Sequence, residues 1–407
     1  MRLSELFTKT RRTPPKDEES ANAIFLEQGG FIKKEAAGVY TFLPLGLRVL
    51  NKIENIVREE MNRIGGAEIL MPALHPAENW EATGRWNKFD ALFKTESRFG
   101  GRYALGPTHE EIIYPLLKRF LSSYKDLPIK AYQIQTKFRD EKRAKAGLLR
   151  SREFRMKDFY SFHAGDKERD KFYEEMKRAY LKTFRRLGLK VIVAEASGGT
   201  FSELSLEFQV ASAAGEDILF LCRKCGFARN KEIAAGGEKC RKCGGRTEEI
   251  KTIEAGNIFP LKEKFAEDFG LKFKDAKGKE RLVSAGCYGL GTTRVMGAAV
   301  EAGHDERGII WPKEIAPFQI HLIELDKDAS KIYSRMVAEG REVLYDDRRG
   351  ATAGEKFVDA DLIGAPVRVV LSARTMKNGS VEIKKRDSNK IELIKTSNLY
   401  SYISKNS

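Results

Sequence analysis

Apolar and polar residues alternate with two interleaved periods along the first three quarters of the chain. Segments with apolar residues every three or four positions predict amphipathic helices, and shorter segments with a period of two predict strands. After the last strand of the first group, a cysteine-rich segment and a linker are predicted as far as residue 258. The predicted helices span 47–64, 109–123, 166–187 and 289–302, and the predicted strands span 68–71, 102–105, 130–138, 153–159, 190–194, 217–221 and 282–285.

From about residue 316 the pattern becomes a regular alternation of strands and helices. This alternation predicts a small α/β domain with a mostly parallel sheet. The proline-containing segment 311–317 marks its beginning. The predicted elements are a strand over 319–325, a helix over 327–338, a strand over 342–345, a helix over 354–363 and a strand over 367–371.

The length and composition are those of a globular protein with two or three domains. The chain has 407 residues, of which 42% are hydrophobic and 32% charged. No apolar run is long enough to span a membrane, so a membrane partner is not expected. The first 15 residues lack the apolar centre of a signal peptide, and this favours a cytoplasmic location.

The net charge of +15 favours a polyanionic partner such as RNA. An inert basic surface is the alternative interpretation. The basic residues recur in separate clusters, as an extended ligand would require. These clusters are Lys118-Arg119, Lys137 with Arg139, the series Lys142, Arg143, Lys145, Arg150 and Arg152, and Lys384-Lys385-Arg386.

Four of the five cysteines form a pattern that is typical of a zinc site. Cys222, Cys225, Cys240 and Cys243 have the spacing C-x2-C-x14-C-x2-C, in which two turns each present a pair of thiolates. Disulfides or unliganded buried cysteines are the alternatives. An all-cysteine site is closed, so we expect a structural zinc ion and look for the chemistry elsewhere.

Phe138-Arg139-Asp140-Glu141 ends a predicted strand, and Glu153-Phe154 begins the next one after a basic loop. An arginine at the end of a strand can neutralise a phosphate. A glutamate two residues later points the same way and can accept from an amino group, while a phenylalanine on the returning strand can stack on a base. Alone, this pattern is also compatible with a surface hairpin held by salt bridges.

Two further motifs sit at predicted helix starts. Gly289 and Gly291 permit a tight turn before a helix whose first turn contains Arg294, an arrangement suited to an anion. Taken alone, the motif is also compatible with a plain glycine-rich turn. Thr108 and Glu111 have the spacing of a capping box, which explains Thr108 but leaves Glu110 without a structural role.

In chain order, Pro72, the Arg139 hairpin and the Gly289–Arg294 turn resemble the three motifs of class II aminoacyl-tRNA synthetases. Longer segments resemble bacterial-type prolyl-tRNA synthetase more closely, over nearly the whole chain. These segments are AGVYTFLPLG at 37–46, LGPTHE at 105–110, QTKFRDE at 135–141, SFH at 161–163, GCYGLG at 286–291, YDDR at 345–348 and DADLIG at 359–364.

This resemblance implies an α+β fold, in which helices flank the antiparallel catalytic sheet of class II synthetases. A zinc knuckle is inserted, and a C-terminal α/β anticodon-binding domain follows. The implied boundaries are 1–221 and 251–314 for the catalytic domain, 222–250 for the knuckle and 315–407 for the anticodon-binding domain.

The resemblance also implies a reaction and its residues. ATP and L-proline would form prolyl-adenylate, and the prolyl group would move to the 3′ end of proline tRNA, with Arg139 and Arg294 as the catalytic pair. Mg²⁺ would bridge phosphates next to Glu207, and a homodimer would form through 47–72. The implied ATP-binding residues are Arg139, Glu141, Arg150, Phe154, Glu207 and Arg294; the proline-binding residues are Thr108, Glu110, Arg139, Asp158, Tyr160, His163 and Cys287; and the tRNA-binding residues are Asp347, Arg348, Lys384, Lys385 and Arg386.

The chain departs from the family in two places. The large editing insertion between the second and third motifs is replaced by the knuckle, so any correction of mischarged tRNA is expected from a separate deacylase. The family's Ser-His-Glu-Phe reads Ser205-Leu206-Glu207-Phe208, which removes an imidazole. A threonine-specific class II enzyme and a non-catalytic tRNA-binding relative are the alternatives.

Overall fold

The computed structural model describes residues 1–234 and 239–406. Contacts between residues divide the chain into two units, and each is described by itself. One unit contains 36–39 and 53–298, and the other contains 1–35, 40–52 and 299–407. No described helix is both long and apolar enough to cross a membrane.

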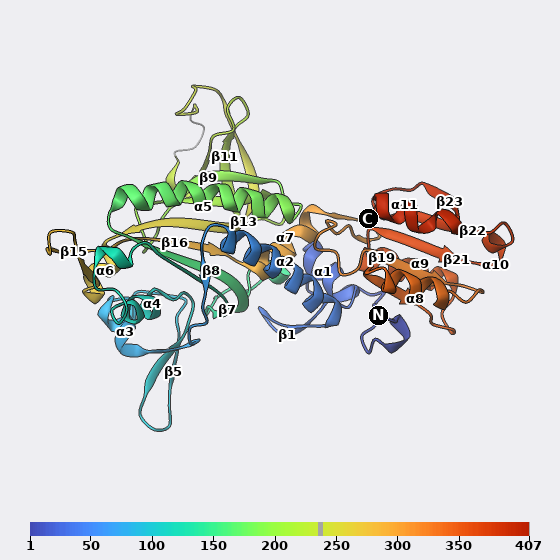
Figure 1. The fold of residues 1–407 in the computed structure, drawn as a ribbon, viewed down its shortest axis with the longest axis horizontal. Helices are drawn as coiled ribbons and strands as arrows, with labels where there is room; N and C mark the ends of the chain where they lie inside the picture. Colours follow the sequence, from blue (N-terminus) through green and yellow to red (C-terminus); the bar gives the residue numbers. More distant parts are fainter. Residues whose placement is uncertain (235–238, 407) are drawn as a thin grey trace. The chain divides into compact units, whose positions relative to one another are not determined.

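The unit of residues 53–298 is built on an antiparallel sheet with neighbours in the order β13-β16-β8-β7, to which β3 adds a parallel edge strand (Figure 1). The β7–β8 register pairs Phe138 with Glu153, as expected for the predicted hairpin. Cys287 on β16 lies opposite Tyr160 on β8. The strands are β3 Ala67–Glu68, β7 Ile129–Phe138, β8 Glu153–His163, β13 Thr247–Lys262 and β16 Ser284–Leu290.

The long helix α5, Asp166–Arg186, covers one face of this sheet (Figure 1). Phe172 on α5 lies against Phe159 and Tyr288, since odd positions of β8 point toward the helix. Even positions of β8 point to the opposite face, where Tyr160 packs in a core with α4 and α6. The helices of this region are α2 Pro44–Arg63, α3 Ala77–Ala82, α4 Glu110–Leu117, α6 Lys264–Phe269 and α7 Thr292–Ala302.

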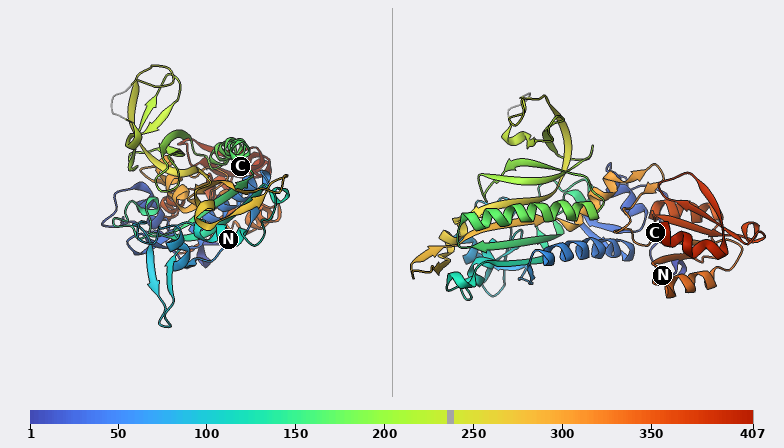
Figure 2. Two further views of the ribbon diagram at one scale, coloured as in Figure 1. Left: turned by 90° about the vertical axis from the view of Figure 1, so that its left-hand side faces the viewer. Right: turned by 45° about the horizontal axis from the view of Figure 1, so that its top comes forward.

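The prediction of a linker that reaches residue 258 is wrong, because most of this segment forms the strand β13. Pro260 and Gly256 obscured its period in the sequence, but the proline lies at a shift in the ladder, where its missing N–H costs little. β13 also pairs with both β10 and β11, and the pairings β13-β10-β9-β12-β11-β13 close a ring (Figure 2). These strands are β9 Val191–Ser197, β10 Leu204–Ala211, β11 Asp217–Cys222 and β12 Ala228–Asn230.

The α/β domain in the other unit has the sheet order β20-β19-β21-β22-β23. The first three strands are parallel, as the alternation predicts, and β22 and β23 add an antiparallel hairpin that the sequence analysis missed. The elements are β19 Ile320–Glu324, α8 Ser330–Ala338, β20 Val343–Asp346, α9 Ala353–Ile363, β21 Val367–Leu371, α10 Ala373–Met376, β22 Ser380–Lys385, β23 Ile391–Lys395 and α11 Leu399–Asn406.

The N-terminal residues of the chain bind to this same domain. The Arg2 guanidinium donates to Asp347 at 2.7 Å, and Arg12 forms an ion pair with Asp359 at 2.7 Å. These contacts explain why residues 1–35 group with the C-terminal part of the chain. The remaining elements are α1 Ala21–Gln28, β1 Ile32–Ala36, β2 Val39–Phe42, β4 Leu74–Pro76, β5 Phe93–Glu96, β6 Arg102–Leu105, β14 Lys272–Lys274, β15 Glu280–Leu282, β17 His304–Asp305 and β18 Gly308–Ile309.

Candidate active site and metal centre

Four of the residues predicted to bind ATP line one cavity of about 240 Å³. Arg139 and Glu141 come from the end of β7, and Arg150 comes from the loop that follows. Arg294 lies in the first turn of α7, after Gly289 and Gly291. The rest of the lining is mostly uncharged but includes three carboxylates, Glu216 before β11, Asp217 on β11 and Glu254 on β13.

Arg139 lies against an aromatic ring and has an unused donor. Its guanidinium lies 5.2 Å from the centre of the Phe154 ring, on the partner strand of the hairpin. Burial, and then the nearby Arg294, lower the pKa of Arg139, while the carboxylates of Glu254, Glu141 and Glu110 oppose this change. Its buried Nε has no hydrogen-bond partner within the described residues. An anion in the cavity would supply that partner.

The two other cavity arginines are held by carboxylates. Arg150 donates to Glu141 at 2.9 and 2.8 Å and to Glu216 at 2.7 Å. Its hydrogen bonds with Glu141 are the largest cause of its raised pKa. Arg294 donates to the carbonyl and the carboxylate of Glu254, both at 3.0 Å. These pairs hold both arginines at the cavity wall.

Glu207 does not line this cavity, although it was predicted to hold Mg²⁺ there. Its carboxylate accepts hydrogen bonds from the amides of Gln209 at 2.8 Å, Asn230 at 3.1 Å and Asn257 at 3.4 Å. Burial, and then Glu254, raise the pKa of Glu207 to about 8. Leu206 shares the opposite face of β10 with Phe208, which packs against Tyr180 of α5. The imidazole replaced by Leu206 would therefore point away from Glu207.

Thr108 and Glu110 lie together at the start of α4. The Thr108 hydroxyl donates to Glu110 Oε2 at 2.5 Å, and Glu110 Oε1 is buried without a hydrogen-bond partner among the described residues. The predicted capping box of Thr108 and Glu111 is therefore wrong. Glu111 instead accepts from Arg85 at 2.8 Å, and this ion pair replaces the local cap.

Arg85 is a functional candidate that the sequence analysis missed. Its buried guanidinium lies 2.8 Å from Glu111 and 3.7 Å from Glu110. Burial raises the pKa of Glu111 to about 7, and Arg85 opposes that change. No local sequence pattern indicates a role for Arg85, because its two carboxylate partners are 25 or more residues away in the sequence. The guanidinium is enclosed by the rings of Trp80, Phe89, Phe201 and Phe265, at 4.8 to 5.4 Å from their centres.

Asp158, Tyr160 and Cys287 lie on the face of the sheet that packs against α4, next to Thr108 and Glu110, and we call this cluster the amino-acid pocket. The Tyr160 hydroxyl donates to Asp158 at 2.9 Å and accepts from the backbone N–H of His109 at 3.0 Å. Burial, and then the Glu110 carboxylate, raise the pKa of the Cys287 thiol. The structure therefore brings these three predicted residues together with Thr108 and Glu110.

A buried network of polar side chains holds Asp158 in place. Lys137 is 0% exposed, lies 2.7 Å from Asp158 Oδ1 and contacts His109 Nδ1 at 2.6 Å. His109 and His75 both contact the carbonyl of Pro72 through Nε2 at 3.1 Å, and this assigns the Nε2–H tautomer to each ring. Lys137 is therefore not part of an RNA-binding surface. The two-residue period of the sequence QTKFR puts Lys137 on the same face as Arg139, and this pattern could have indicated that Lys137 points into the site.

His163 does not line the pocket, contrary to the prediction. It is an odd position of β8, so it points toward α5, and its ring lies 5.6 Å from that of Phe172. Burial lowers the pKa of His163 to about 4. It is therefore a core histidine on the face opposite Asp158 and Tyr160.

In the C-terminal domain, two of the predicted tRNA-binding residues are buried. Arg386 donates to Asp305 at 2.8 and 2.6 Å, and Lys384 is 8% exposed. A tRNA bound to this surface cannot reach either side chain as it lies, so both assignments are wrong. Lys385 is exposed on β22, while Asp347 and Arg348 are half-buried: Asp347 accepts from Arg2, and Arg348 donates to Asp346 at 2.8 and 2.6 Å.

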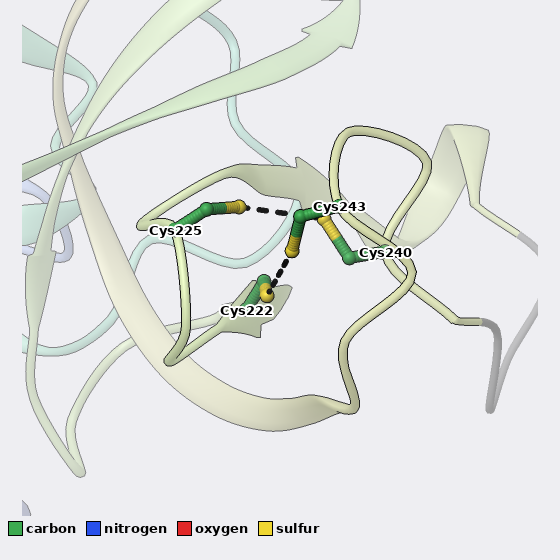
Figure 3. Close-up of side chains that lie close together, drawn as sticks. All are labelled: Cys222, Cys225, Cys240 and Cys243. Atoms are coloured by element: carbon green, nitrogen blue, oxygen red, sulfur yellow. Dashed lines mark hydrogen bonds between the residues drawn. The ribbon is translucent and has the colours of Figure 1, made fainter.

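The four cysteines of the predicted zinc site meet at one end of the strand ring (Figure 3). Their sulfur atoms all lie within 4.8 Å of one another, and the Cys222–Cys243 and Cys225–Cys240 distances are both 3.5 Å. A tetrahedral ion with bonds of about 2.3 Å separates its sulfur ligands by about 3.8 Å. The cysteines are free thiols, so the disulfide alternative is wrong and the arrangement fits zinc.

The two halves of this centre have the same sequence, Cys-Arg-Lys-Cys-Gly, at 222–226 and 240–244. In each, the glycine N–H donates to the first cysteine carbonyl, at 2.8 and 2.7 Å. Gly226 and Gly244 have φ of 73° and 68°, a region that glycine adopts without strain. The repeated pentapeptide therefore builds the same turn twice.

Comparisons with known proteins agree with this geometry. The family model of the class II tRNA synthetase core domain (G, H, P, S and T) matches residues 93–303, and that of the anticodon binding domain matches 315–406. Among solved structures, prolyl-tRNA synthetase from Cryptosporidium parvum, complexed with halofuginone and AMPPNP, superposes with a TM-score of 0.79 at 18% identity, covering 94% of this chain and 76% of that chain. This similarity establishes the fold.

Sequence relatives establish the family. The proline–tRNA ligase of Anaplasma phagocytophilum is 38% identical, and the alignment covers 99% of this chain and 100% of that protein. That of Dehalococcoides mccartyi is 33% identical over 551 aligned positions, covering 97% of each chain. That alignment is much longer than 407 residues, so the D. mccartyi protein contains insertions that this chain lacks. With the class II fold and four of the predicted nucleotide-binding residues around one cavity, the chain belongs to the proline–tRNA ligases.

Proposed function

We propose that this chain binds L-proline between Glu110 and Arg139 and activates it with ATP in the adjoining cavity. The observation that carries the proposal is a pair of unused buried atoms, Glu110 Oε1 and Arg139 Nε. One is an anionic acceptor and the other a cationic donor. A zwitterionic amino acid would satisfy both, with its imino group at Glu110 and Thr108 and its carboxylate at Arg139.

The side chains around these two atoms would fit the proline ring. Tyr160 and Cys287 present buried, uncharged surface to the pocket, and burial raises the pKa of both groups, so both stay protonated near neutral pH. Asp158 fixes the Tyr160 hydroxyl, and Lys137 holds Asp158. Such a pocket would position a small ring without adding a second charge.

ATP would lie in the cavity between the β7–β8 loop and α7. Phe154 would stack on the adenine ring after Arg139 turns toward the α-phosphate, and Glu141 would accept from the adenine amino group. Arg294 would exchange its contact with Glu254 for the γ-phosphate, at the N-terminal end of a helix that favours anions.

Activation requires positioning and charge neutralisation more than proton transfer. A carboxylate oxygen of proline attacks the α-phosphate, the bond to the β-phosphate oxygen breaks, and pyrophosphate leaves. Arg139, held at both the carboxylate and the α-phosphate, would align the two and stabilise the charge of the transition state. The 3′ hydroxyl of proline tRNA then attacks the prolyl carbonyl, and AMP leaves.

Mg²⁺ would offset the charge of the ATP phosphates in this cavity. We propose Glu254 as its protein ligand, in place of the predicted Glu207. Glu254 lines the cavity, and carboxylate oxygens suit Mg²⁺. Glu207 would act indirectly, because Asn257 donates to both Glu207 and Glu254.

We propose that zinc binds Cys222, Cys225, Cys240 and Cys243 and has a structural role. Four protein ligands leave no open position for catalysis. The requirement for reduced thiols also fits the cytoplasmic location expected from the sequence.

We propose a homodimer formed through the segment that includes β3. This strand lies at the edge of the central sheet, and the nearby Leu70 and Leu74 are 77% and 47% exposed. An edge strand beside exposed leucines is a surface that a second copy would cover. Sedimentation of a fully active monomer at micromolar concentration would contradict this proposal.

The C-terminal domain would bind the anticodon arm of proline tRNA. Exposed groups such as Lys385 would contact the RNA, whereas Arg386 and Lys384 would maintain the fold. Because the knuckle occupies the place of the editing insertion, we also propose that this chain does not edit in cis. A separate deacylase would then correct mischarged tRNA.

The test is ATP–pyrophosphate exchange measured with each amino acid in turn. Proline alone should give high exchange, and Arg139→Ala should lower the proline-dependent rate by at least roughly 100-fold, because the transition state loses a buried charged contact of several kcal/mol. Arg281→Ala, which removes an exposed arginine paired with Asp275, is the matched control. Near-normal exchange by a folded Arg139→Ala protein would refute the assignment, and so would a preference for threonine.

A further inference from the structure

The knuckle has a basic outer surface that the proposed reaction does not use. Each Cys-Arg-Lys-Cys-Gly turn exposes its arginine and lysine, which gives Arg223, Lys224, Arg241 and Lys242. We call these four side chains the knuckle cations. Lys239 and Arg246 are also exposed, and their backbones pair as an isolated antiparallel β-bridge beside the second turn. Figure 2 shows this yellow-green segment projecting from the sheet beyond α5.

Neighbouring carboxylates among the described residues do not neutralise these charges. Arg223 pairs with Glu248, but no ion pair of Lys224, Arg241 or Lys242 occurs within residues 1–234 and 239–406. Four thiolates on one zinc ion make a doubly negative centre, which nearby cations would partly offset. Among the described residues of the knuckle, the six exposed cations outnumber the two negative charges of the zinc centre and the one of Glu248, so a net positive surface remains.

Two adjacent strands connect this surface to the catalytic cavity. β11 begins at Asp217, which lines the cavity, and ends at Cys222. β13 begins at Thr247 beside the knuckle and reaches Glu254 in the cavity wall. At about 3.4 Å per residue, the five steps of β11 span about 17 Å. The paired strands therefore hold the knuckle cations at a nearly constant distance outside the cavity.

A tRNA undergoing aminoacylation must place its 3′ end in the cavity while the adjoining helical arm stays outside. Its phosphates carry the opposite charge to the knuckle cations, and lysine and arginine on short turns are suited to phosphate contacts without base recognition. We propose that the knuckle cations bind the backbone of the acceptor arm of proline tRNA. This inference rests on the proposed function, because it assumes that tRNA is the second substrate.

The test replaces all four knuckle cations by glutamine, leaving every cysteine and glycine in place. We expect zinc content, melting temperature and proline-dependent pyrophosphate exchange to stay as in the wild type. The KM for proline tRNA in aminoacylation should rise at least tenfold. The dependence of log Kd for tRNA on log salt concentration should become shallower by about one for each phosphate that the variant no longer neutralises.

The matched control removes four exposed lysines from the β14–β15 hairpin of the same unit: Lys272, Lys274, Lys277 and Lys279. It has the same change in net charge and should keep the wild-type KM and salt dependence. An unchanged KM in the knuckle variant would overturn the proposal, and so would an equal increase in the control. If the fourfold variant loses zinc, the variant with Lys224→Gln and Lys242→Gln replaces it, with at least a threefold rise in KM expected.

Direct titration with fluorescent proline tRNA separates the knuckle contact from the proposed function. Weaker binding by the knuckle variant, with pyrophosphate exchange intact, supports the knuckle contact. Equal binding by variant and wild type refutes it without affecting the proposed function. Absence of proline-dependent exchange in the wild type would refute the proposed function itself.

Discussion

Arg85 shows how one buried residue can control the charge of the amino-acid pocket. It is the cation next to Glu110 and Glu111, and four aromatic rings leave it little access to water. Without Arg85, the two adjacent buried carboxylates would repel each other, and protonation of one of them would relieve this repulsion. Arg85 opposes the rise in the pKa of Glu111, so its loss would leave Glu111 more protonated and reduce the negative charge next to the imino group of proline.

We therefore predict that Arg85→Met raises the KM for proline at least tenfold in pyrophosphate exchange, with a much smaller change in the KM for ATP. The defect should diminish as the pH is raised, because a higher pH deprotonates Glu111 and restores its negative charge. Arg102→Met, which breaks an exposed pair with Glu81, is the control. Equal increases in both KM values would indicate general damage to the fold and contradict this role.

His321 is a second buried residue with a measurable consequence. It lies near the start of β19, and neither ring nitrogen has a partner within the described residues. The charged groups around it are Asp346, Arg348, Asp359 and Arg368, but burial dominates and lowers its pKa to about 4.

The unfolded chain binds a proton at this site near pH 6.5, whereas the folded chain does so only near pH 4. The contribution of this residue to stability is therefore complete above pH 6.5 and falls as the pH drops toward 4. Between about pH 7.5 and about pH 5 the decrease from this residue is on the order of 2 kcal/mol. We predict that His321→Leu narrows the difference in melting temperature between these two pH values. Equal differences for variant and wild type would exclude this contribution.

At the scale of elements, we expect the knuckle to depend on the proposed zinc ion more than on apolar packing. Its described cysteines sit beyond the small core of Ala194, Leu219, Leu221 and Ala228, which lies inside the strand ring. Metal binding and folding are then coupled, since a thiolate site does not exist in the unfolded segment.

We predict that Cys240→Ser removes zinc and lowers the melting temperature by several degrees, while proline-dependent exchange falls less than threefold. Elemental analysis and thermal denaturation measure the first two effects. The control is chelation of the wild-type metal, which should reproduce the change in stability. Wild-type protein purified under reducing conditions without zinc would refute the site.

At the scale of the whole molecule, we expect the lack of the family's editing insertion to limit the accuracy of aminoacylation. Alanine is smaller than proline, and a pocket that fits proline cannot exclude it sterically. A ligand that is smaller by two methylene groups is disfavoured by only about 10- to 10³-fold. The alignment with the D. mccartyi relative is longer than this chain, so that relative contains residues that this chain lacks.

We therefore predict that the enzyme charges proline tRNA with alanine and does not hydrolyse the product. The measurement is deacylation of preformed alanyl-tRNA that carries the proline anticodon, with and without the enzyme. Addition of a deacylase from another source is the positive control. Hydrolysis clearly above the spontaneous rate would show that another surface of this chain edits.

The sequence alone was sufficient for features encoded over short distances. The spacing of the four cysteines predicted their cluster, and the period of two placed Arg139, Glu141 and Phe154 around one hairpin. The helix over 166–187 and the alternation after residue 316 were confirmed for the same reason. Each of these depends on neighbouring residues, whose geometry the backbone largely dictates.

Only the tertiary structure decided which charges are buried and which are exposed. Lys137 and Arg386 look like surface cations in the sequence, but each is paired with a distant aspartate and removed from solvent. His163 is close to Tyr160 in the sequence and lies on the other side of the sheet. A buried charge is stable only where a partner reaches it, and those partners come from segments that the fold alone brings together.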